Sequence, residues 1–405
     1  MTMTINNEHK KLNVPNLRFP EFQGEWEKCR LGEVCTFLSG GTPKIDVKEY
    51  WNGTIPFVSA ISMHDTYILD SKLHISEEGL KHGSRLLTKN NLLLLVRGSM
   101  LWNTIPICLN KNDVAFNQDV KGIIVNDTIN NEFLLYWLKS KEQRLKYMVT
   151  GTGLGAGKLD TSDLLSMIVY IPAMKEQDKV ARLLSLFDER IAAQNKIIED
   201  LKKLKCAIIE KHYLQAKLHK YKICDLGVPF SVGSLSKEDL SEKGHECILY
   251  GELFTTYDCV INEVKSHTNK IANTTLSQKG DLVFPSSTTV DAVSLISPSV
   301  IDIPNVILGG DMFGIHIDKK FNAYYLSYYI NLIARKKLAI YAKGSTIIHL
   351  HYNDIANAQL LLPDLCEQDI IAKCMIAEDN KIKVEEQLLT KLENQKQYLL
   401  RQMFV

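Results

Sequence analysis

The chain has 405 residues, of which 45% are hydrophobic and 23% charged, and its formal net charge is +1. A charge this close to zero excludes a globally basic protein, so any binding to nucleic acid has to come from local patches. No apolar run is long enough to span a bilayer, and the first 20 residues lack the core of a signal peptide. The nine cysteines are scattered without a C-x-x-C pair, which argues against a zinc site or a disulfide framework. We therefore expect a cytoplasmic protein with no bound metal and no contact with a membrane.

The N-terminal part of the chain predicts one mixed domain. Residues 1–18 are polar and are expected to be disordered, and the domain is predicted to cover 19–173. Apolar runs bounded by turn residues predict its strands, and apolar residues at three-and-four spacing predict its helix. The predicted strands lie at 31–37, 55–58, 91–96 and 120–125, the predicted helix at 131–147, and a glycine-rich segment, TGTGLGAGK, at 150–158.

The chain then repeats a segment that it uses again near its end. Residues 159–184 read LDTSDLLSMIVYIPAMKEQDKVARLL, and residues 350–375 read LHYNDIANAQLLLPDLCEQDIIAKCM. Without a gap, the two prolines coincide, and the triplet Glu-Gln-Asp at 176–178 falls on the same triplet at 367–369. In both copies a capped apolar strand ends at the proline and passes through the triplet into a long helix. Two equivalent domains, each followed by its own helix, can be related by internal pseudo-two-fold symmetry.

A second domain is predicted over 218–364, with features that match those of the first. The matching features are an opening strand at 221–226, a middle strand at 280–285, Gly-Gly-Asp at 309–311 in place of Asn-Gln-Asp at 117–119, a helix at 322–341 and a polar loop at 343–346. Mixed strands and helices in both domains predict an α/β (α+β) fold class.

Two long helices are predicted, a central one over 174–217 and a C-terminal one over 365–405. Each has apolar residues at three-and-four spacing, which form one narrow stripe on a helix roughly 50 Å long. Such a stripe favours a partner helix. Internal two-fold symmetry would make the two helices an antiparallel, coiled-coil-like spacer between the domains. Two alternatives remain open: each helix lies across its neighbouring domain, or the helices form a homodimer.

These features resemble the specificity subunit of a type I restriction-modification system. The phrase VPNLRFPEFQGEWEKCRLGEV at 14–34 and FNQDVKGI at 116–123 carry the resemblance, together with the two strand-proline-helix segments. The resemblance covers nearly the whole chain, whereas the intervening domain sequences diverge, as that family's target-recognition domains do.

The resemblance implies a non-catalytic subunit that binds double-stranded DNA. It also implies that the subunit holds two methyltransferase (modification) subunits and, in the nuclease, two translocating restriction subunits. Each recognition domain would read one half of a bipartite site in the major groove, with the helix pair setting the spacing. S-adenosylmethionine, ATP and Mg²⁺ are then expected on the partner subunits only. Because the two domains differ in sequence, the two half-sites should differ as well.

Candidate DNA contacts fall into two groups. Cations beside glycine- and hydroxyl-rich loops can grip phosphates, and polar loop side chains can reach base edges. Surface salt bridges and ordinary solvated helix faces are the alternatives. The phosphate candidates are Arg144, Lys146, Lys158, Arg335, Lys337 and Lys343, and the base-reading candidates are Thr42, Lys44, Arg97, Ser99, Asn103, Asn117, Gln118, Ser234, Lys237, Tyr250, Ser286, Ser287, Thr288 and Thr289. Arg97 is the sharpest candidate because arginine is the usual partner of guanine O6 and N7.

Apolar residues outside the two stripes are candidates for docking the methyltransferase subunits, with burial against the domain cores as the alternative. They are Leu184, Ile197, Ile209, Ile370 and Val384.

No catalytic motif is found. The segment at 150–158 lacks the spacing of a nucleotide-binding loop, because Leu159 follows Lys158 where Ser or Thr is needed. His349 and His351 could share one face of a strand, but no third metal ligand is evident, so we interpret them as part of a polar face. The alternatives to DNA reading are a helical adaptor that binds proteins and, less favoured, a standalone methyltransferase or nuclease.

Overall fold

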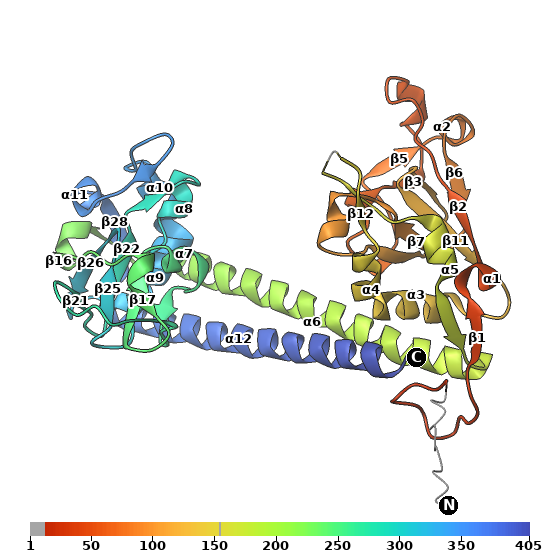
Figure 1. The fold of residues 1–405 in the computed structure, drawn as a ribbon. Helices are drawn as coiled ribbons and strands as arrows, with labels where there is room; N and C mark the ends of the chain where they lie inside the picture. Colours follow the sequence, from red (N-terminus) through yellow and green to blue (C-terminus); the bar gives the residue numbers. More distant parts are fainter. Residues whose placement is uncertain (1–12, 154) are drawn as a thin grey trace, which may run out of the picture. The chain divides into compact units, whose positions relative to one another are not determined.

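A computed structural model describes residues 13–153 and 155–405, and Figure 1 shows its ribbon. The chain forms two compact units. Unit 1 runs to Asn195 and also includes Leu388–Val405, and unit 2 is Lys196–Gln387. Both units mix helices and sheets, which confirms the predicted fold class.

Unit 1 is built on a five-stranded sheet whose central strand is LLLL, with all four side chains buried. Its strand order is β2 (Cys35–Ser39), β11 (Val120–Val125), β7 (Leu92–Leu95), β9 (Ile107–Asn110) and β4 (Tyr67–Ile68). A four-stranded sheet contains β5 (Leu73–Ile75), β3 (Ile55–Val58), β10 (Val114–Phe116) and β6 (Arg85–Leu87). A strand pair, β1 (Glu27–Arg30) with β14 (Ile168–Ile171), leads to the long helix α6. The other helices are α1 (Leu31–Val34), α2 (Glu77–Lys81), α3 (Asn131–Ser140), α4 (Glu142–Tyr147) and α5 (Thr161–Ser166).

Unit 2 repeats the five-stranded sheet with the same strand directions. Its order is β16 (Gly227–Ser231), β26 (Met312–Ile317), β22 (Asp281–Pro285), β24 (Ser299–Ile301) and β19 (Val260–Ile261), and only the last pair is parallel, as in unit 1. A second sheet contains β17 (Leu240–Ser241), β20 (Ser266–Thr268), β18 (His245–Leu249), β25 (Ile307–Gly309) and β21 (Thr275–Leu276), and β15 (His219–Lys222) pairs with β28 (Gln359–Leu362). The helices are α7 (Glu252–Thr255), α8 (Ala292–Leu295), α9 (Ala323–Tyr329), a π-helical turn at Ile330–Ala334, α10 (Arg335–Ala339) and α11 (Tyr352–Ile355).

Five sequence predictions need correction. The predicted strand at 31–37 begins as helix α1, because Leu31 and Val34 turn one apolar face into the core, and becomes a strand only at Cys35. The strand predicted at 221–226 ends at Lys222. The helices predicted at 131–147 and 322–341 are each divided, the second by the π-helical turn. Residues 13–18 are not disordered, since Leu17 N donates to Gln402 O at 2.9 Å, and residues 1–12 lie outside the described residues.

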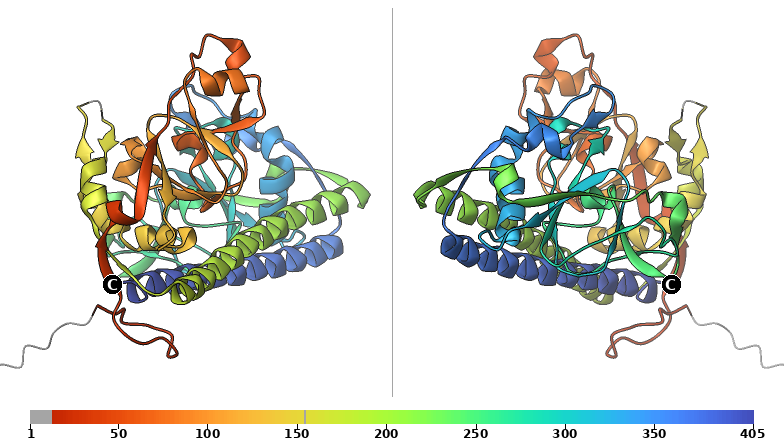
Figure 2. Two further views of the ribbon diagram at one scale, coloured as in Figure 1. Left: turned by 90° about the vertical axis from the view of Figure 1, so that its right-hand side faces the viewer. Right: turned by 90° about the vertical axis from the view of Figure 1, so that its left-hand side faces the viewer.

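The two long helices lie within the predicted ranges 174–217 and 365–405 and are slightly shorter than these ranges. Helix α6 covers Met174–Gln215 and α12 covers Leu365–Gln402, and each crosses the boundary between the units. Within each unit a part of α6 lies beside a part of α12 (Figures 1 and 2). Lys202 of α6 pairs with Glu386, and Lys205, further along α6, pairs with Asp379, which comes earlier in α12. The helices are therefore antiparallel partners, as predicted.

The Gln and Asp of the repeated triplet fix the start of one helix in each unit. In unit 1, Asn130 caps α3 by accepting a hydrogen bond from Phe133 N at 3.0 Å. Gln177 Oε1 accepts from Asn130 N at 2.7 Å, and Gln177 Nε2 donates to Pro172 O at 2.9 Å. Asp178 Oδ1 accepts from Asn130 Nδ2 at 2.9 Å. The triplet therefore ties the repeated proline strand to the N-cap of α3.

Unit 2 forms the same hydrogen bonds. Asn322 caps α9 by accepting from Tyr325 N at 2.9 Å, and its own backbone N donates to Gln368 Oε1 at 2.9 Å. Gln368 Nε2 donates to Pro363 O at 2.9 Å, and Asn322 Nδ2 donates to Asp369 Oδ1 at 2.7 Å. Since the two glutamines are almost fully buried, their amides are structural parts of the units.

Each unit also contains an ion pair between the two long helices, and a tyrosine from a domain helix donates a hydrogen bond to the acid of this pair. In unit 1, Tyr136 of α3 donates to Asp188 Oδ2 of α6 at 2.8 Å, and Lys396 of α12 pairs with the same carboxylate. In unit 2 the acid lies on α12 and the lysine on α6. Tyr328 of α9 donates to Asp379 Oδ2 of α12 at 2.5 Å, and Lys205 of α6 supplies the cation.

The glutamine hydrogen bonds give a stability prediction. Gln177→Ala or Gln368→Ala leaves a buried N-cap amide and a buried carbonyl without their partners, so each should lower the free energy of unfolding by about 2–3 kcal/mol. Gln143→Ala, on the exposed face of α4, is the matched control and should change it by less than about 0.5 kcal/mol. Urea unfolding of the full chain measures both, and equal effects at the buried and exposed sites would contradict the structural role.

The buried tyrosines give a pH prediction. Burial and the neighbouring Asp188 carboxylate raise the pKa of Tyr136 far above its usual range, and burial with Asp379 does the same for the pKa of Tyr328. The unfolded chain then loses these protons first, so the stability that they contribute is complete below about pH 10 and is lost above it. Combining Tyr136→Phe with Tyr328→Phe should make the loss of stability between about pH 10 and 11 shallower. Tyr147→Phe, at a 90% exposed residue, is the control, and urea midpoints across this pH range with the same slope in all three proteins would refute the prediction.

Candidate nucleic-acid interface

In unit 1 the strongest base-reading candidate lies directly opposite a phosphate candidate. A small sheet forms from β8 (Arg97–Gly98), β13 (Gly157–Lys158) and β12 (Thr150–Gly151), and its register pairs Arg97 with Lys158. The backbone is held from both sides, because Val96 N donates to Asp119 O at 2.8 Å and Leu159 N donates to Val96 O at 2.9 Å. Both cations are exposed or partly exposed.

The loops at 40–44 and 117–119 lie beside each other. Thr42 Oγ1 donates to Gln118 Oε1 at 2.7 Å, and Gly41 N donates to Phe116 O at 3.0 Å. Gly40 approaches so closely that a Cβ there would lie 2.2 Å from Phe116 O, so only glycine fits. Asp119 links this pair of loops to β8 through its carbonyl. The structure thus brings Thr42, Gln118, Arg97 and Lys158 onto connected segments of one unit.

The cations of unit 1 differ in how far they are already paired. Within the described residues, the side chains of Lys44, Arg97 and Arg144 have no hydrogen bond or ion pair, whereas Lys146 pairs with Glu142 and Lys158 with Asp160. Exposed ion pairs of this kind are worth little and exchange readily. Ser99 and Asn103 lie on and just after the short 3-10 turn Ser99–Trp102 that follows Arg97.

Unit 2 has the same strand pair with different side chains. Strand β23 (Ser287–Thr288) pairs with β27 (Ile348–His349), and Ser287 lies opposite His349. The anchors also repeat, since Ser286 N donates to Asp311 O at 2.7 Å and Leu350 N donates to Ser286 O at 2.9 Å. Ser287 therefore occupies the position of Arg97, and His349 that of Lys158.

Sequence reasoning missed His349 as a candidate. It was interpreted as part of a polar face, and Lys343 was taken as the counterpart of Lys158. The ungapped repeat already held the signal, because it aligns Leu159 with Leu350 and hence Lys158 with His349.

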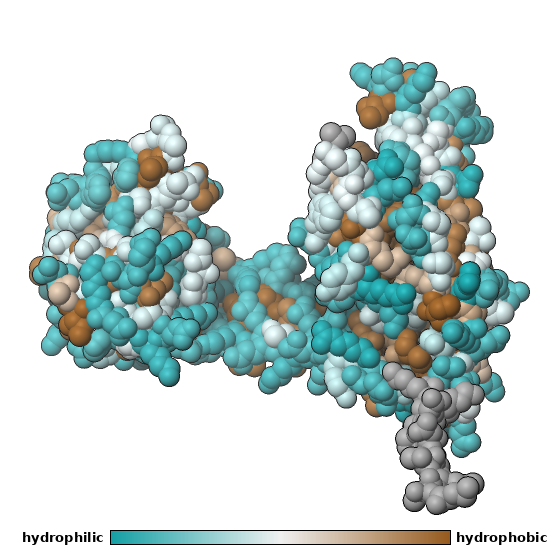
Figure 3. Space-filling view, in the orientation of Figure 1, coloured by the Kyte–Doolittle hydropathy of each residue, from teal (hydrophilic) through white to brown (hydrophobic). Residues whose placement is uncertain are grey.

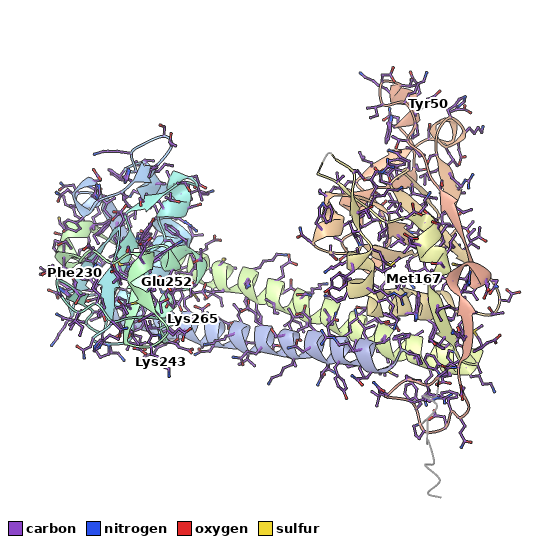
Figure 4. The ribbon with its side chains drawn as sticks, viewed as in Figure 1. Tyr50, Met167, Phe230, Lys243, Glu252 and Lys265 are labelled. Carbon is purple, nitrogen blue, oxygen red and sulfur yellow. The ribbon has the colours of Figure 1, made fainter. Side chains whose placement is uncertain are left out.

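A pocket of about 730 Å³ opens beside this strand pair and brings together five of the second-domain candidates. They are Tyr250, Ser287, Thr288, Thr289 and Arg335, and Phe254, Asp311 and His349 also line the pocket. Glu252, labelled in Figure 4, holds the loop that carries Tyr250 by accepting from Leu249 N at 2.8 Å and from Ser266 Oγ at 2.5 Å. Ser234 and Lys237 are exposed but are not among the lining residues.

Several second-domain candidates have internal partners. Ser286 is only 3% exposed and does not line the pocket, so its assignment as a base reader is corrected, whereas Ser287, which is 7% exposed, does line the pocket. Arg335 donates to the carbonyls of Val293 and Ser294 and so caps the end of α8. Lys337 donates to Gln359 O at 2.7 Å, and Lys343 pairs with Asp354 at 2.5 Å. Phosphate contact by these three cations stays a prediction.

The predicted partner-binding residues divide into two groups. Leu184 and Ile209, both on α6, are fully buried in the cores of units 1 and 2. They cannot dock a partner, so their assignment as docking residues is corrected. Ile197, Ile370 and Val384 are 46%, 61% and 61% exposed. Figure 3 shows such apolar residues among hydrophilic ones on the helical segments.

Within residues 13–153 and 155–405, no group of three or more His, Cys, Asp and Glu side chains could hold a metal ion. His349 and His351 stack with ring centroids 6.2 Å apart, but only His349 belongs to a strand, and His351 precedes α11. No helix of the described chain is long and apolar enough to cross a membrane.

Comparison with known proteins gives sequence relatives of one kind. A family model, the type I restriction modification DNA specificity domain, matches residues 23–203 and 223–394. The EcoR124I/EcoR124II specificity subunit of a type I restriction enzyme of Escherichia coli is 30% identical over 193 residues, 46% of this chain and 47% of that subunit. This chain thus matches about half the length of that relative. The MjaVIII specificity subunit of Methanocaldococcus jannaschii is 26% identical over 426 residues, 98% of this chain and 96% of that one.

Solved structures share the fold. The crystal structure of the type I restriction-modification system S subunit from M. genitalium has a TM-score of 0.62 at 17% identity, covering 97% of this chain and 99% of that chain. A chain from a structure titled for complex assembly and conformational transition of the type I R-M system has a TM-score of 0.55 at 14% identity, covering 93% and 96%. The two stretches that the family model matches contain both strand pairs, β8 with β13 and β23 with β27, each here called a paired-strand frame, and most of both long helices. This chain therefore belongs to the family of type I restriction-modification DNA specificity subunits.

Proposed function

We propose that each unit reads one half of an asymmetric, bipartite DNA site through its paired-strand frame. The observation that carries the proposal is the difference between the two frames at equivalent positions. Arg97 and Lys158 lie opposite each other in unit 1, and Ser287 and His349 lie opposite each other in unit 2. The backbone anchors are the same, so the frame is shared while the recognising side chains differ.

The chemistry of these side chains suits different base edges. An arginine can donate two hydrogen bonds to O6 and N7 of guanine in the major groove, whereas serine accepts or donates one hydrogen bond at several bases. The second unit adds Tyr250, Thr288 and Thr289 around its pocket. The unpaired cations Lys44 and Arg144 are suited to phosphates, which position a protein without reading sequence.

We also propose that α6 and α12 set the distance between the two DNA segments that are read. Both helices are continuous through the residues where one unit gives way to the other, at Asn195 in α6 and at Gln387 in α12. A continuous helix has a fixed rise of about 1.5 Å per residue, so its length is a measure that the sequence controls.

The catalytic work is assigned to partner subunits in this proposal. Two modification subunits would dock on the helices, near Ile197, Ile370 and Val384, and bind S-adenosylmethionine, and two restriction subunits would bring ATP and Mg²⁺. The complex would act in the cytoplasm, where the DNA is. The family membership supports the partnership, and the exposed apolar side chains on the helices support the docking surface.

Base reading by Arg97 is testable with a single substitution. Arg97→Ala should cost about 1–3 kcal/mol of binding and relax the preference at one base position in one half-site only. Arg144→Ala is the matched control, because a phosphate contact should weaken binding to all sequences equally and lower the salt slope by about one. Methylation mapping and binding to randomised duplexes, both with the modification subunit present, measure the two effects. If Arg97→Ala weakened binding without changing the sequence preference, Arg97 would be a backbone contact.

The spacing role is testable by paired insertions. Adding four residues after Asn195 and four after Gln387 lengthens both helices by about one turn, or roughly 6 Å, and keeps their partners in register. We expect the spacer between the half-sites to grow by about two base pairs while both half-sequences stay the same. An insertion in α6 alone is the control, and it should lower stability because it moves the α6 lysines out of register with α12. A paired insertion that leaves the spacer unchanged in methylation maps would rule out the spacing role.

A further inference from the structure

Residues 17–26, here called the N-terminal strap, cover one face of α6 in unit 1. Arg18 donates from Nε and Nη2 to the two carboxylate oxygens of Glu176, each at 2.8 Å, and Trp26 Nε1 donates to Glu176 Oε1 at 3.3 Å. Glu176 is only 2% exposed, so its charge depends on these donors.

The strap also covers the next turn of the same face. Lys179, three residues after Glu176 and therefore a neighbour on the helix surface, places Nζ 4.5 Å from the ring centroid of Phe19 and pairs with Glu21. The strap thus presents a guanidinium, an aromatic ring and an acid to two successive turns of α6.

The equivalent face of α12 in unit 2 has no strap over it, and it is only partly exposed. The repeat aligns Glu367 with Glu176 and Ile370 with Lys179. Within the described residues, Glu367 Oε2 is buried and has no hydrogen-bond partner, and Ile370 is 61% exposed. Tyr325, which is fully buried, also has a hydroxyl without a partner. Burial is the main cause that raises the pKa of this phenol, and the charges of Tyr329, Tyr213 and Glu367 add to it.

Unit 2 has no strap of its own that could fill this face. Helix α6 runs to Gln215 and β15 begins at His219, so only three residues separate them. The strap of unit 1 is already engaged with Glu176 and is not available for Glu367. A buried carboxylate oxygen and a buried hydroxyl without partners are costly, and natural structures keep such groups mainly where something else completes them.

We propose that the Glu367–Ile370 face of α12 receives an arginine-bearing extended segment of a modification subunit, which imitates the N-terminal strap. The guanidinium would bind Glu367 through the carboxylate oxygen that the chain leaves accessible, because Oε2 is enclosed, and an apolar or aromatic side chain would pack on Ile370. Ile370 stands where unit 1 has Lys179 and carries no charge. The partner segment therefore needs no acid equivalent to Glu21. This inference rests on the proposed function for the identity of the partner and adds the chemistry of the contact.

The test compares Glu367→Gln with the matched variant Glu176→Gln in the full chain. In the chain alone, Glu176→Gln should lower the melting temperature because it removes the charge that Arg18 and Trp26 bind. Glu367→Gln should leave the melting temperature unchanged or raise it, because no group of the chain depends on that charge. In calorimetric titration with the modification subunit, Glu367→Gln should weaken binding by about tenfold or more. Ile370→Asp should weaken it as well, whereas Ile370→Leu should retain it.

Three results would overturn the inference. Glu367→Gln could leave the affinity for the modification subunit unchanged, or it could destabilise the chain alone as much as Glu176→Gln does. It could also abolish self-association of the chain by itself, which would make a second copy the occupant. Failure of the proposed function is distinguishable, because it would appear in the complex of the unaltered chain as methylation without sequence preference.

Discussion

Asp188 is a largely buried carboxylate on one long helix, and the lysine that balances its charge stands on the other long helix. The symmetric pair, Asp379 with Lys205, has the two helices in exchanged roles. A buried acid without its cation would strongly destabilise the fold, so neither unit is complete with only one half of the chain. The tyrosine that completes each trio, Tyr136 or Tyr328, comes from a domain helix and connects this charge pair to the recognition unit.

The apolar cores follow the same exchange. Leu400 of α12 is buried in the core of unit 1 together with Met403 and Phe404, which follow this helix, and Ile209 and Tyr213 of α6 pack in the core of unit 2. The Gln177 and Gln368 hydrogen bonds then fix the domain helices against the repeated proline strands. The hydrogen bonds that fix the domain helices are thus duplicated in the sequence, whereas the paired strands carry Arg97 in unit 1 and Ser287 in unit 2.

Whether a feature of the structure could be predicted from the sequence depended on the kind of contact that forms it. The two long helices and the repeat were predictable because apolar spacing and identity between copies are local signals. The role of the Gln-Asp pair was not, because its partner Asn130 lies far away in the sequence and is recognisable only once the strand and helix are packed. Leu184 and Ile209 were misassigned because we assumed that each long helix buries only one apolar stripe, whereas α6 also buries residues outside that stripe.

The side chains that we propose for DNA recognition were partly predictable. Arg97 and Lys158 were both chosen, but their cross-strand pairing needs the register of β8 and β13. Arg335 was chosen for its charge, and its use in capping α8 depends on tertiary contacts that no local pattern reports. His349 was within reach of the alignment, yet the nearby Lys343 offered the more obvious charge.

The contact of Lys141 Nζ with the carbonyl of Val405 has a consequence for synthesis. Unit 1 needs Leu388–Val405 for its core, yet the ribosome makes these residues only after all of unit 2. The first recognition unit therefore leaves the exit tunnel with an open apolar seam beside α3, and this seam closes only after all of unit 2 has been made. A chain that stops early would expose this seam instead of releasing one finished recognition domain, so chaperones and proteases would encounter truncated products as unfolded protein.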